Sequence, residues 1–411
     1  WASQIAGSPS KSFFYPSVGL SWVPSSTWDL GNAFSYLKLR GSIASVGLPF
    51  PRFLTTPTYE YDATGKIWKD KTHYPIGDLK PERTITYEVG IDARLWKNIS
   101  LSASWYSADT KNQTFDPALP PSSSYTTIYL QTGHVRNTGV ELSLGYSNQW
   151  RDFGWSSNFT FSWNKNEIID LASGALNPVT GQPLNLSELD IKGLGKAKYI
   201  LKQGGTLGDL YTTSDLKFND NGYVEVDKAG NLLLTDEGDQ IYLGSVFPSE
   251  NLAWRNDFRY KGINLGLLFT GRIGGICYSA TQANMDLYGV SEVSAAARDA
   301  GGVLINGREM VDAQKWYQAI GSQSGLPQYY TYSATNFRLQ ELSLGYTLPR
   351  KWFRNKMGLT VSFVGRNLWM IYCKAPFDPE AVASTGLSYQ GIDYFMMPSL
   401  RSLGFNVKFE F

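Results

Sequence analysis

Cysteine and histidine are scarce in this chain of 411 residues, which contains two of each. Cys277 and Cys373 are too few for a disulfide framework, and neither has a histidine or cysteine partner at metal-ligand spacing. His73 and His134 offer little acid-base chemistry, and the sequence has no G-x-S-x-G elbow, H-E-x-x-H helix or Walker loop. We therefore expect free thiols, no metal, no cofactor and no enzymatic activity.

Long apolar runs and a surplus of one charge are missing too. No stretch reaches the roughly eighteen consecutive apolar residues of a transmembrane helix, so only a β-barrel could take this chain across a membrane. The 37 basic residues nearly balance the 36 acidic ones, which disfavours nucleic acid as a partner. The first segment, WASQIAGSPSKSFFYPS, has no initiating Met and no signal-peptide pattern. We expect the chain to begin inside a longer protein.

What the sequence does contain is strict alternation of apolar and polar residues. Ile85, Tyr87, Val89, Ile91 and Leu95 are separated by polar or small residues, which is typical of a strand with one greasy face. The pattern recurs along the chain, which is 14% aromatic and contains 40 glycines. It predicts an all-β chain with eleven antiparallel strands at about 13–23, 36–46, 84–95, 99–107, 136–148, 154–164, 251–260, 263–274, 337–348, 358–369 and 400–411.

The connections between these strands are short at one end and long at the other. Short turns fall near residues 97–98, 149–153, 261–262 and 349–357. The long connections fall near 47–83, 108–134, 165–250, 275–335 and 370–398. A soluble β-sandwich also alternates but has short loops at both ends, whereas one-sided length is typical of periplasmic turns opposed to extracellular loops. We expect residues 1–411 to form part of a transmembrane antiparallel β-barrel.

The charged and aromatic residues fit a barrel wall. A lipid-facing Lys or Arg costs about 2 to 4 kcal/mol, and the strand charges all fall on the polar face. These charges are Lys38, Arg40, Glu88, Asp92, Arg94, Lys408 and Glu410. Trp96, Trp150, Trp155 and Trp352 adjoin the short turns, where an aromatic girdle would lie. Bacterial barrels have even strand numbers, so we expect an odd number of further strands outside this chain.

Several segments resemble the SusC/RagA family of TonB-dependent transporters. They include FFYPSVGLSWVPSSTW, GDLKPERTITYEVGIDARLWKNISLSASWY, VRNTGVELSLGYSNQW, NFRLQELSLGYTLPRKW, VSFVGRNLWMIY and DPEAVASTGLSYQGIDYFMMPSLRSLGFNVKFEF. The resemblance implies a 22-stranded barrel of which this chain is the C-terminal half, with a plug and a TonB-contacting segment upstream. It further implies the outer membrane of a Gram-negative bacterium of the Bacteroidetes, and a SusD-like lipoprotein as partner.

Two further implications concern single sites. In the family the last strand ends with an aromatic residue, here Phe411, which we expect to act as a barrel-assembly signal, although it also fits as the last outward-facing side chain. Family members often carry an acidic D-x-N-x-D-G segment, whereas this chain reads SDLKFNDNGYVEVDKAGNLLLTDEGD. Asp220, Asn221, Asp227 and Asp236 there can bind a cation or form Asx-Gly turns, and we favour turns.

The long connections are rich in aromatic side chains, which can stack on sugars or hold peptide side chains. Packing between loops is the competing interpretation. The candidate substrate-binding residues are Tyr125, Tyr129, Tyr211, Trp316, Tyr329, Tyr330, Tyr389 and Tyr394. The segments 165–250 and 275–335 also carry apolar clusters that must be buried, against other loops or against a lid protein. Within the second segment, 312–321 predicts a short amphipathic helix.

The leading hypothesis is active import of oligosaccharides or oligopeptides, driven by TonB with ExbB and ExbD and assisted by a SusD-like lid. A passive porin is the alternative mechanism, and a soluble β-sandwich binding protein is the third possibility. The family handles both glycans and peptides with similar barrels, so the sequence leaves the cargo open.

Overall fold

The structure of the chain is a computed structural model in which one large sheet dominates. It describes residues 14–48, 60–69, 73–74, 81–115, 127–128, 130–171, 182, 186–236, 238, 240–384, 386 and 389–411. Eleven strands follow one another across the sheet in chain order, and every neighbouring pair is antiparallel. They are β1 (Ser17–Trp22), β2 (Phe34–Leu48), β6 (Glu82–Leu95), β7 (Ile99–Phe115), β9 (Leu130–Trp150), β10 (Phe153–Asp170), β15 (Glu250–Tyr260), β16 (Ile263–Ile273), β21 (Asn336–Leu348), β22 (Gly358–Cys373) and β24 (Ser402–Glu410). The eleven predicted strands and the all-β antiparallel fold are confirmed.

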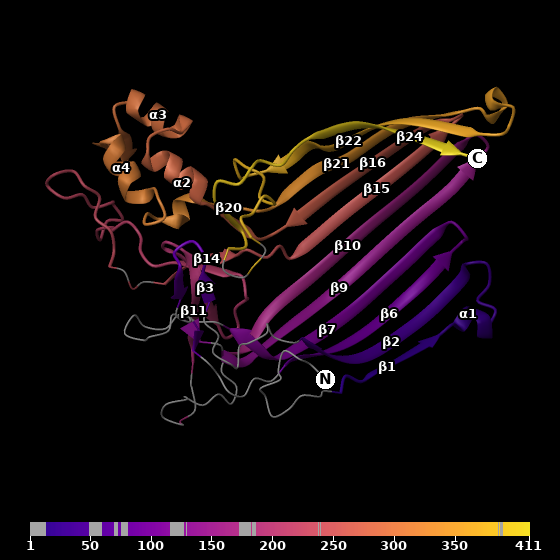
Figure 1. Cartoon of the computed structure of the whole chain (residues 1–411), viewed down its shortest axis with the longest axis horizontal. Coiled ribbons are helices and arrows are strands. Elements are labelled where there is room, and N and C mark those ends of the chain that lie inside the picture. Colours follow the sequence, from indigo (N-terminus) through magenta and orange to yellow (C-terminus); the bar gives the residue numbers. More distant parts are fainter. Residues whose placement is uncertain are drawn as a thin grey trace.

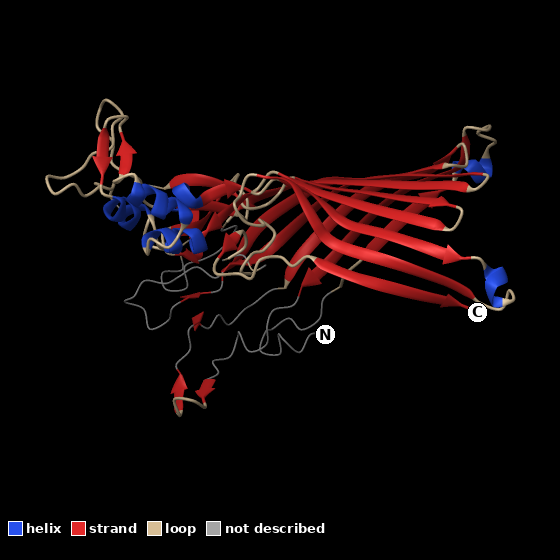
Figure 2. Cartoon of the chain, turned by 90° about the horizontal axis from the view of Figure 1, so that it is seen from above, coloured by secondary structure: helices blue, strands red, loops and turns tan. Residues whose placement is uncertain are grey.

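The two faces of this sheet differ in character along its whole width. Partners on adjacent strands point their side chains to the same face, so a ladder of partners belongs to one face. One ladder is apolar and runs through Ile91, Ala103, Leu142, Phe161 and Leu252. The ladder beside it is polar and runs through Ser104, Glu141, Ser162, Asn251 and Arg272. Seen from above, the sheet bends into a curved wall (Figure 2).

Large apolar side chains stay exposed on one face of this wall. Val89 is 55% exposed, Leu403 62% and Phe405 81%, and these residues sit on apolar strand positions. Monomeric soluble proteins rarely expose a continuous apolar face of this width. In a hydrocarbon surrounding, these side chains are not exposed to water, so the wall needs no protein layer on that side.

Three strands continue furthest past their predicted ends on the side of the long connections. β7 reaches Phe115 instead of residue 107, β9 starts at Leu130 instead of residue 136, and β10 reaches Asp170 instead of residue 164. The added part of β7 includes Lys111 and Asn112, so apolar alternation has stopped there. Outside a hydrocarbon band neither face needs to be apolar, and the pattern therefore could not mark these ends. The connections predicted at 108–134 and 165–250 are shorter by the same residues.

The opposite end of the wall carries only short connections. The helix α1 (Pro24–Thr27) joins β1 to β2, and the 3-10 helix η3 (Arg350–Phe353) joins β21 to β22. Trp96 and Trp352 are more than 60% exposed beside these turns. Trp150 stacks on Phe153 at 5.9 Å, and Trp155 stacks on Phe258 at 6.2 Å. The predicted placement of the four tryptophans beside short turns is confirmed.

The long connections fold into a second structure, the loop platform, which comprises the described residues of 186–248 and 274–335. It lies at the end of the wall opposite the C-terminus (Figure 1). Its main sheet contains β11 (Glu188–Leu194), β12 (Ala197–Lys202), β13 (Asp209–Thr212) and β14 (Ile241–Ser245). Its helices are α2 (Ala280–Leu287), α3 (Glu292–Asp299), α4 (Ala313–Ile320) and the 3-10 helix η2 (Pro327–Tyr330). Small sheets combine β17 (Ile276–Ser279) with β20 (Thr331–Ser333) and β23 (Ile392–Asp393), and β18 (Val303–Ile305) with β19 (Glu309–Val311).

Two further pairs of short strands lie in the first two long connections. They are β3 (Glu60–Asp62) with β4 (Ile67–Lys69), and β5 (His73–Tyr74) with β8 (Thr127–Ile128). Among the described residues no helix is long and apolar enough to cross a membrane.

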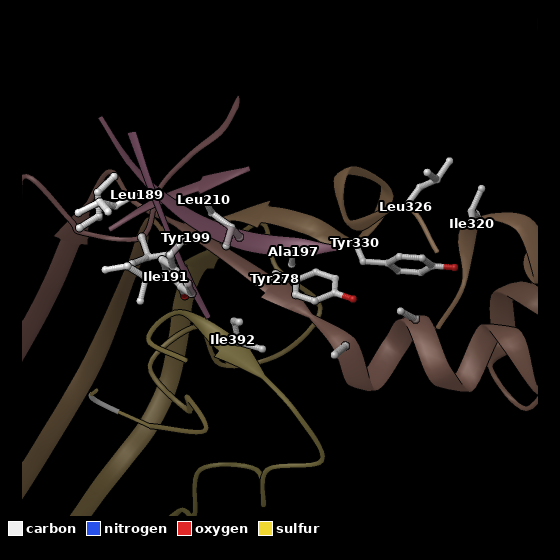
Figure 3. Packing of buried hydrophobic residues seen from close by; sticks show 14 of the residues in the cluster. Leu189, Ile191, Ala197, Tyr199, Leu210, Tyr278, Ile320, Leu326, Tyr330 and Ile392 are labelled. Atoms are coloured by element: carbon white, nitrogen blue, oxygen red, sulfur yellow. The ribbon is translucent and has the colours of Figure 1, made fainter. Parts of the chain in front are cut away.

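The buried hydrophobic core belongs to the loop platform and not to the wall. Tyr199, Leu210, Tyr278 and Leu326 are at most 1% exposed and meet in one cluster (Figure 3). Phe115, Val135 and Ile168 join this cluster from the ends of wall strands, which ties the platform to the wall. The predicted apolar clusters pack here, since Leu232, Tyr317 and Ile320 are core members and Leu234 and Trp316 pack against them. Packing between loops thus accounts for most of that surface, while Tyr242 stays 54% exposed.

Two local predictions in the platform are confirmed, the helix over 312–321 and an Asx turn at Asp227. The helix α4 begins after Asp312, whose carboxylate accepts a hydrogen bond from the Lys315 N–H at 3.1 Å, and it buries Ala313, Tyr317 and Ile320. The stretch 215–236 forms hairpins closed by Asx turns, in which Asp227 accepts bonds from the N–H groups of Ala229 and Asn231, both at 2.8 Å. Gly222 and Gly230 supply the left-handed residues of these turns, with φ of 75° and 78°.

Both cysteines are free, as expected. Cys277 lies in β17 and is 1% exposed, whereas Cys373 ends β22 and is partly exposed. Burial raises the pKa of the Cys277 thiol to about 12, so this thiol stays protonated at neutral pH.

Candidate functional site

The polar face of the wall is the first part of the candidate site. It contains a hollow of about 360 Å³ that spreads over β7, β9, β10 and β15. Small hydroxyl side chains dominate its polar lining, with one arginine, one glutamate and one asparagine: Arg40, Ser102, Ser104, Glu141, Ser143, Thr160, Ser162 and Asn251. Such a surface can exchange hydrogen bonds with water or a polar solute without offering strong apolar contacts.

Charged side chains on this face form ion pairs with one another. Arg40 binds Glu88 closely and lies 3.7 Å from Asp92, which also accepts a 2.7 Å hydrogen bond from Ser102. A second cluster joins Arg255 to Asp257 at 2.9 Å and to Glu341 at 3.5 Å. Glu341 also pairs with Arg366 at 3.1 Å. All these side chains remain partly exposed, which fits a water-filled lumen better than a dry core.

A third cluster lies at the platform end of the polar face, and its central pair of Arg338 and Asp378 is buried. The guanidinium of Arg338, only 5% exposed, donates to both carboxylate oxygens of Asp378 at 3.0 and 2.8 Å. Glu380 lies 3.1 Å from the same guanidinium and 3.5 Å from Arg272. Sequence analysis did not single out these residues, because Asp378 and Glu380 come from a loop whose path no alternation reveals.

The structure separates the predicted aromatic residues by exposure. Tyr211 and Tyr330 are buried in the platform, at 8% and 2% exposed. Tyr329, Tyr389 and Tyr394 are about 40% exposed, and Trp316 is partly buried with its ring edge against Tyr329 at 6.1 Å. Burial and the Asp215 carboxylate raise the pKa of Tyr329 to about 12. Tyr125 and Tyr129 lie outside the described residues.

The described part of the chain contains no cluster of side chains suited to a metal ion. There, no three or more His, Cys, Asp or Glu side chains converge as a metal would require. The carboxylate of Asp227 accepts hydrogen bonds from the Asn231 side chain and from N–H groups of the turn. These hydrogen bonds hold the pKa of Asp227 below the usual range.

An outer apolar face, an inner polar face and folded loops at one end define the wall of a transmembrane β-barrel. The model of the family "TonB dependent receptor-like, beta-barrel" matches residues 2–245, and this chain belongs to that family. The family consists of receptors and transporters, and TonB-dependent receptors are outer-membrane barrels.

Individual relatives agree with this assignment. The chain is 25% identical to TonB-dependent receptor P3 of Formosa agariphila, over 97% of this chain and 42% of the relative. It is 20% identical to TonB-dependent receptor SusC of Bacteroides thetaiotaomicron, over 81% of this chain and 32% of the relative. The fold matches the RagAB peptide importer in its closed-closed state with a TM-score of 0.71 at 20% identity, over 96% of this chain and 43% of that one. The SusC/RagA-like resemblance is confirmed, and the chain spans less than half the length of these relatives.

Proposed function

We propose that the whole protein is an outer-membrane, TonB-dependent active importer of oligosaccharides or oligopeptides. The observation that supports this proposal is the wall itself, with an apolar outer face, a polar inner face that carries ion pairs, and a folded platform over one end. Membership of the TonB-dependent receptor family supports active import, and SusC and the RagAB peptide importer are among the similar proteins. We further propose that the platform end is extracellular, that residues 1–411 are the C-terminal half of a 22-stranded barrel, and that the protein transports without catalysis.

Uptake by the native bacterium tests this proposal. Labelled oligosaccharides and oligopeptides are offered to parental cells, to cells lacking the gene, and to parental cells treated with a protonophore. Active import predicts that accumulation of one cargo class disappears in both altered conditions, because TonB depends on the energised inner membrane. A passive porin predicts loss in the deletion strain alone, and this result would overturn the active mechanism.

We propose that a SusD-like lipoprotein covers the platform and that TonB with ExbB and ExbD acts through another part of the protein. Among the predicted aromatic residues, Tyr329, Tyr389 and Tyr394 are the proposed cargo contacts because their side chains are exposed. Loop packing already explains the buried platform residues, so the lid requires its own test. Affinity purification of the tagged full-length transporter should recover one lipoprotein in stoichiometric amount, and recovery of the barrel alone would contradict this partnership.

A further inference from the structure

The segment between β22 and β24 does not cross directly from one strand to the next. Residues 374–401, here named the mouth strap, leave Cys373 and return to the wall at Ser402. Residues 385, 387 and 388 of the strap lie outside the described part. Between its ends the strap contacts the polar face of the wall and then the platform, so it connects the two.

The first anchorage of the mouth strap is the buried ion cluster around Arg338. Arg338 partners Thr270 across the strands, on the polar face of the wall. Its Nε and Nη2 donate to the Asn336 amide oxygen at 3.3 and 3.1 Å, in addition to the bonds with Asp378. Almost every donor of this guanidinium is therefore committed, and Asp378 is held in two-pronged geometry.

Asp378 is the matching residue on the strap. Burial alone would raise its pKa, but hydrogen bonds from Arg338 and Ser399 hold the pKa below the usual range. Asp378 also accepts the Glu380 N–H at 3.0 Å, which fixes the turn that follows. The carboxylate therefore both pins the strap to the wall and shapes it.

The second anchorage joins the strap to the platform. β23 pairs in parallel with β17, and the Ser279 hydroxyl donates to the Asp393 carboxylate at 2.7 Å. The Phe395 N–H donates to the Thr281 hydroxyl at 2.6 Å. Ile392 is fully buried in the platform core, so this anchorage combines hydrogen bonds with apolar packing.

Beside the first anchorage the strap is not packed tightly on the strand beneath it. A hollow of about 380 Å³ separates β22 from the strap. Its lining includes Asn367, Met370, Cys373, Phe377, Asp378 and Arg401. Apolar packing at the start of the strap is thus incomplete, and the ion cluster attaches this part of the strap to the wall.

We propose that Arg338 is a positioning residue that fixes the mouth strap against the lumen face at the platform end. Removing one partner of a buried ion pair leaves an uncompensated buried charge, which is strongly destabilising and breaks the contact. Loss of the pair therefore frees residues 374–384 from the wall while β23 keeps the far part on the platform. This inference concerns the structure of the mouth and holds whichever cargo the proposed importer takes.

Thiol labelling of the full-length transporter in its native membrane tests the proposal. The background carries Cys277→Ser and Cys373→Ser, and Ala375→Cys is the reporter because Ala375 is only 9% exposed. Adding Arg338→Gln should raise the rate of maleimide labelling by about tenfold or more, since an unmade charged hydrogen bond shifts a local equilibrium by at least that factor. The matched control Arg366→Gln removes a nearby arginine whose side chain is 67% exposed, and it should leave the rate unchanged.

A gel that compares unheated with heated samples shows whether each variant is folded, because a folded barrel migrates differently until heat unfolds it. If Arg338→Gln does not fold, Asp378→Asn tests the same contact from the strap and leaves the wall intact. An unchanged rate in the folded Arg338 or Asp378 variant would overturn the proposal, because other contacts would then hold the strap. Equal acceleration in the Arg366 control would also overturn it, because the wall as a whole would have loosened.

Discussion

At the scale of single residues, the surroundings of a charged side chain depend on the face of the wall that it occupies and on the loops that cover it. Arg40 and Arg338 both face the polar side, yet the first is one-third exposed and the second is buried. Alternation in the sequence predicted the side of Arg40 correctly, but it gave no prediction for Arg338, where a bulge between Leu339 and Glu341 shifts the alternation. It could not predict burial of Arg338, because the covering carboxylates come from a loop that lies 40 residues further along the chain.

The two cysteines give a prediction at this scale. With a pKa of about 12, only about one Cys277 thiol in ten thousand is ionised at pH 8. Cys277 should therefore resist maleimide in the folded protein at pH 8, whereas the partly exposed Cys373 should react. Mass spectrometry after a timed pulse measures this, with denatured protein as the control in which both thiols react. Rapid labelling of Cys277 in the folded state would contradict its burial.

The C-terminal residue, Phe411, gives a second prediction at this scale. Phe411 is 96% exposed and follows β24, in which Leu403, Phe405, Val407 and Phe409 all stay exposed on the apolar face. If Phe411 serves as an assembly signal, its deletion should lower the amount of folded barrel in the outer membrane several-fold, while Phe411→Tyr should preserve it. Surface immunoblotting measures both variants. Normal levels after deletion would leave Phe411 as an outward-facing side chain without a role in assembly.

At the scale of elements, the sequence predicted strands far better than loops. All eleven wall strands were predictable because lipid demands a period of two wherever it touches the sheet. The four-stranded platform sheet was not, because segments such as AKYILK and DLYT are short and buried and show no sustained alternation. Only α4 among the platform helices was visible in advance, through the spacing of Ala313, Tyr317 and Ile320.

The separation between platform core and wall predicts a local effect of core mutation. Leu210 is fully buried in the platform, so Leu210→Ala should destabilise that region by about 2 to 5 kcal/mol through the cavity it leaves. The wall should keep its heat resistance, because its strands depend on backbone pairing and lipid contact. Limited proteolysis at the platform, compared with the gel shift of the intact barrel, measures both responses. Leu39→Ala on the apolar face of β2 is the matched control, and loss of barrel heat resistance in Leu210→Ala would contradict the separation.

At the scale of the whole molecule, the wall is suited to a lipid surrounding and the platform to water. The wall buries little apolar surface against protein and exposes its apolar face, while the platform has an ordinary core. The candidate cargo contacts were only partly predictable for this reason. Tyr211 and Tyr330 were indistinguishable in sequence from Tyr389 and Tyr394, and only folding of the loops separates the buried pair from the exposed pair.

The assignment of the two faces is the central claim, and labelling from within the membrane tests it most directly. Single cysteines are placed along β6 of the cysteine-free full-length protein and exposed to a maleimide confined to the hydrocarbon phase. The structure predicts labelling at positions 85, 89 and 91, whose native residues are Ile85, Val89 and Ile91, and protection at 88 and 92, where Glu88 and Asp92 face Arg40. Labelling at 88 and 92 with protection at 89 and 91 would place the polar face against lipid and contradict the barrel wall.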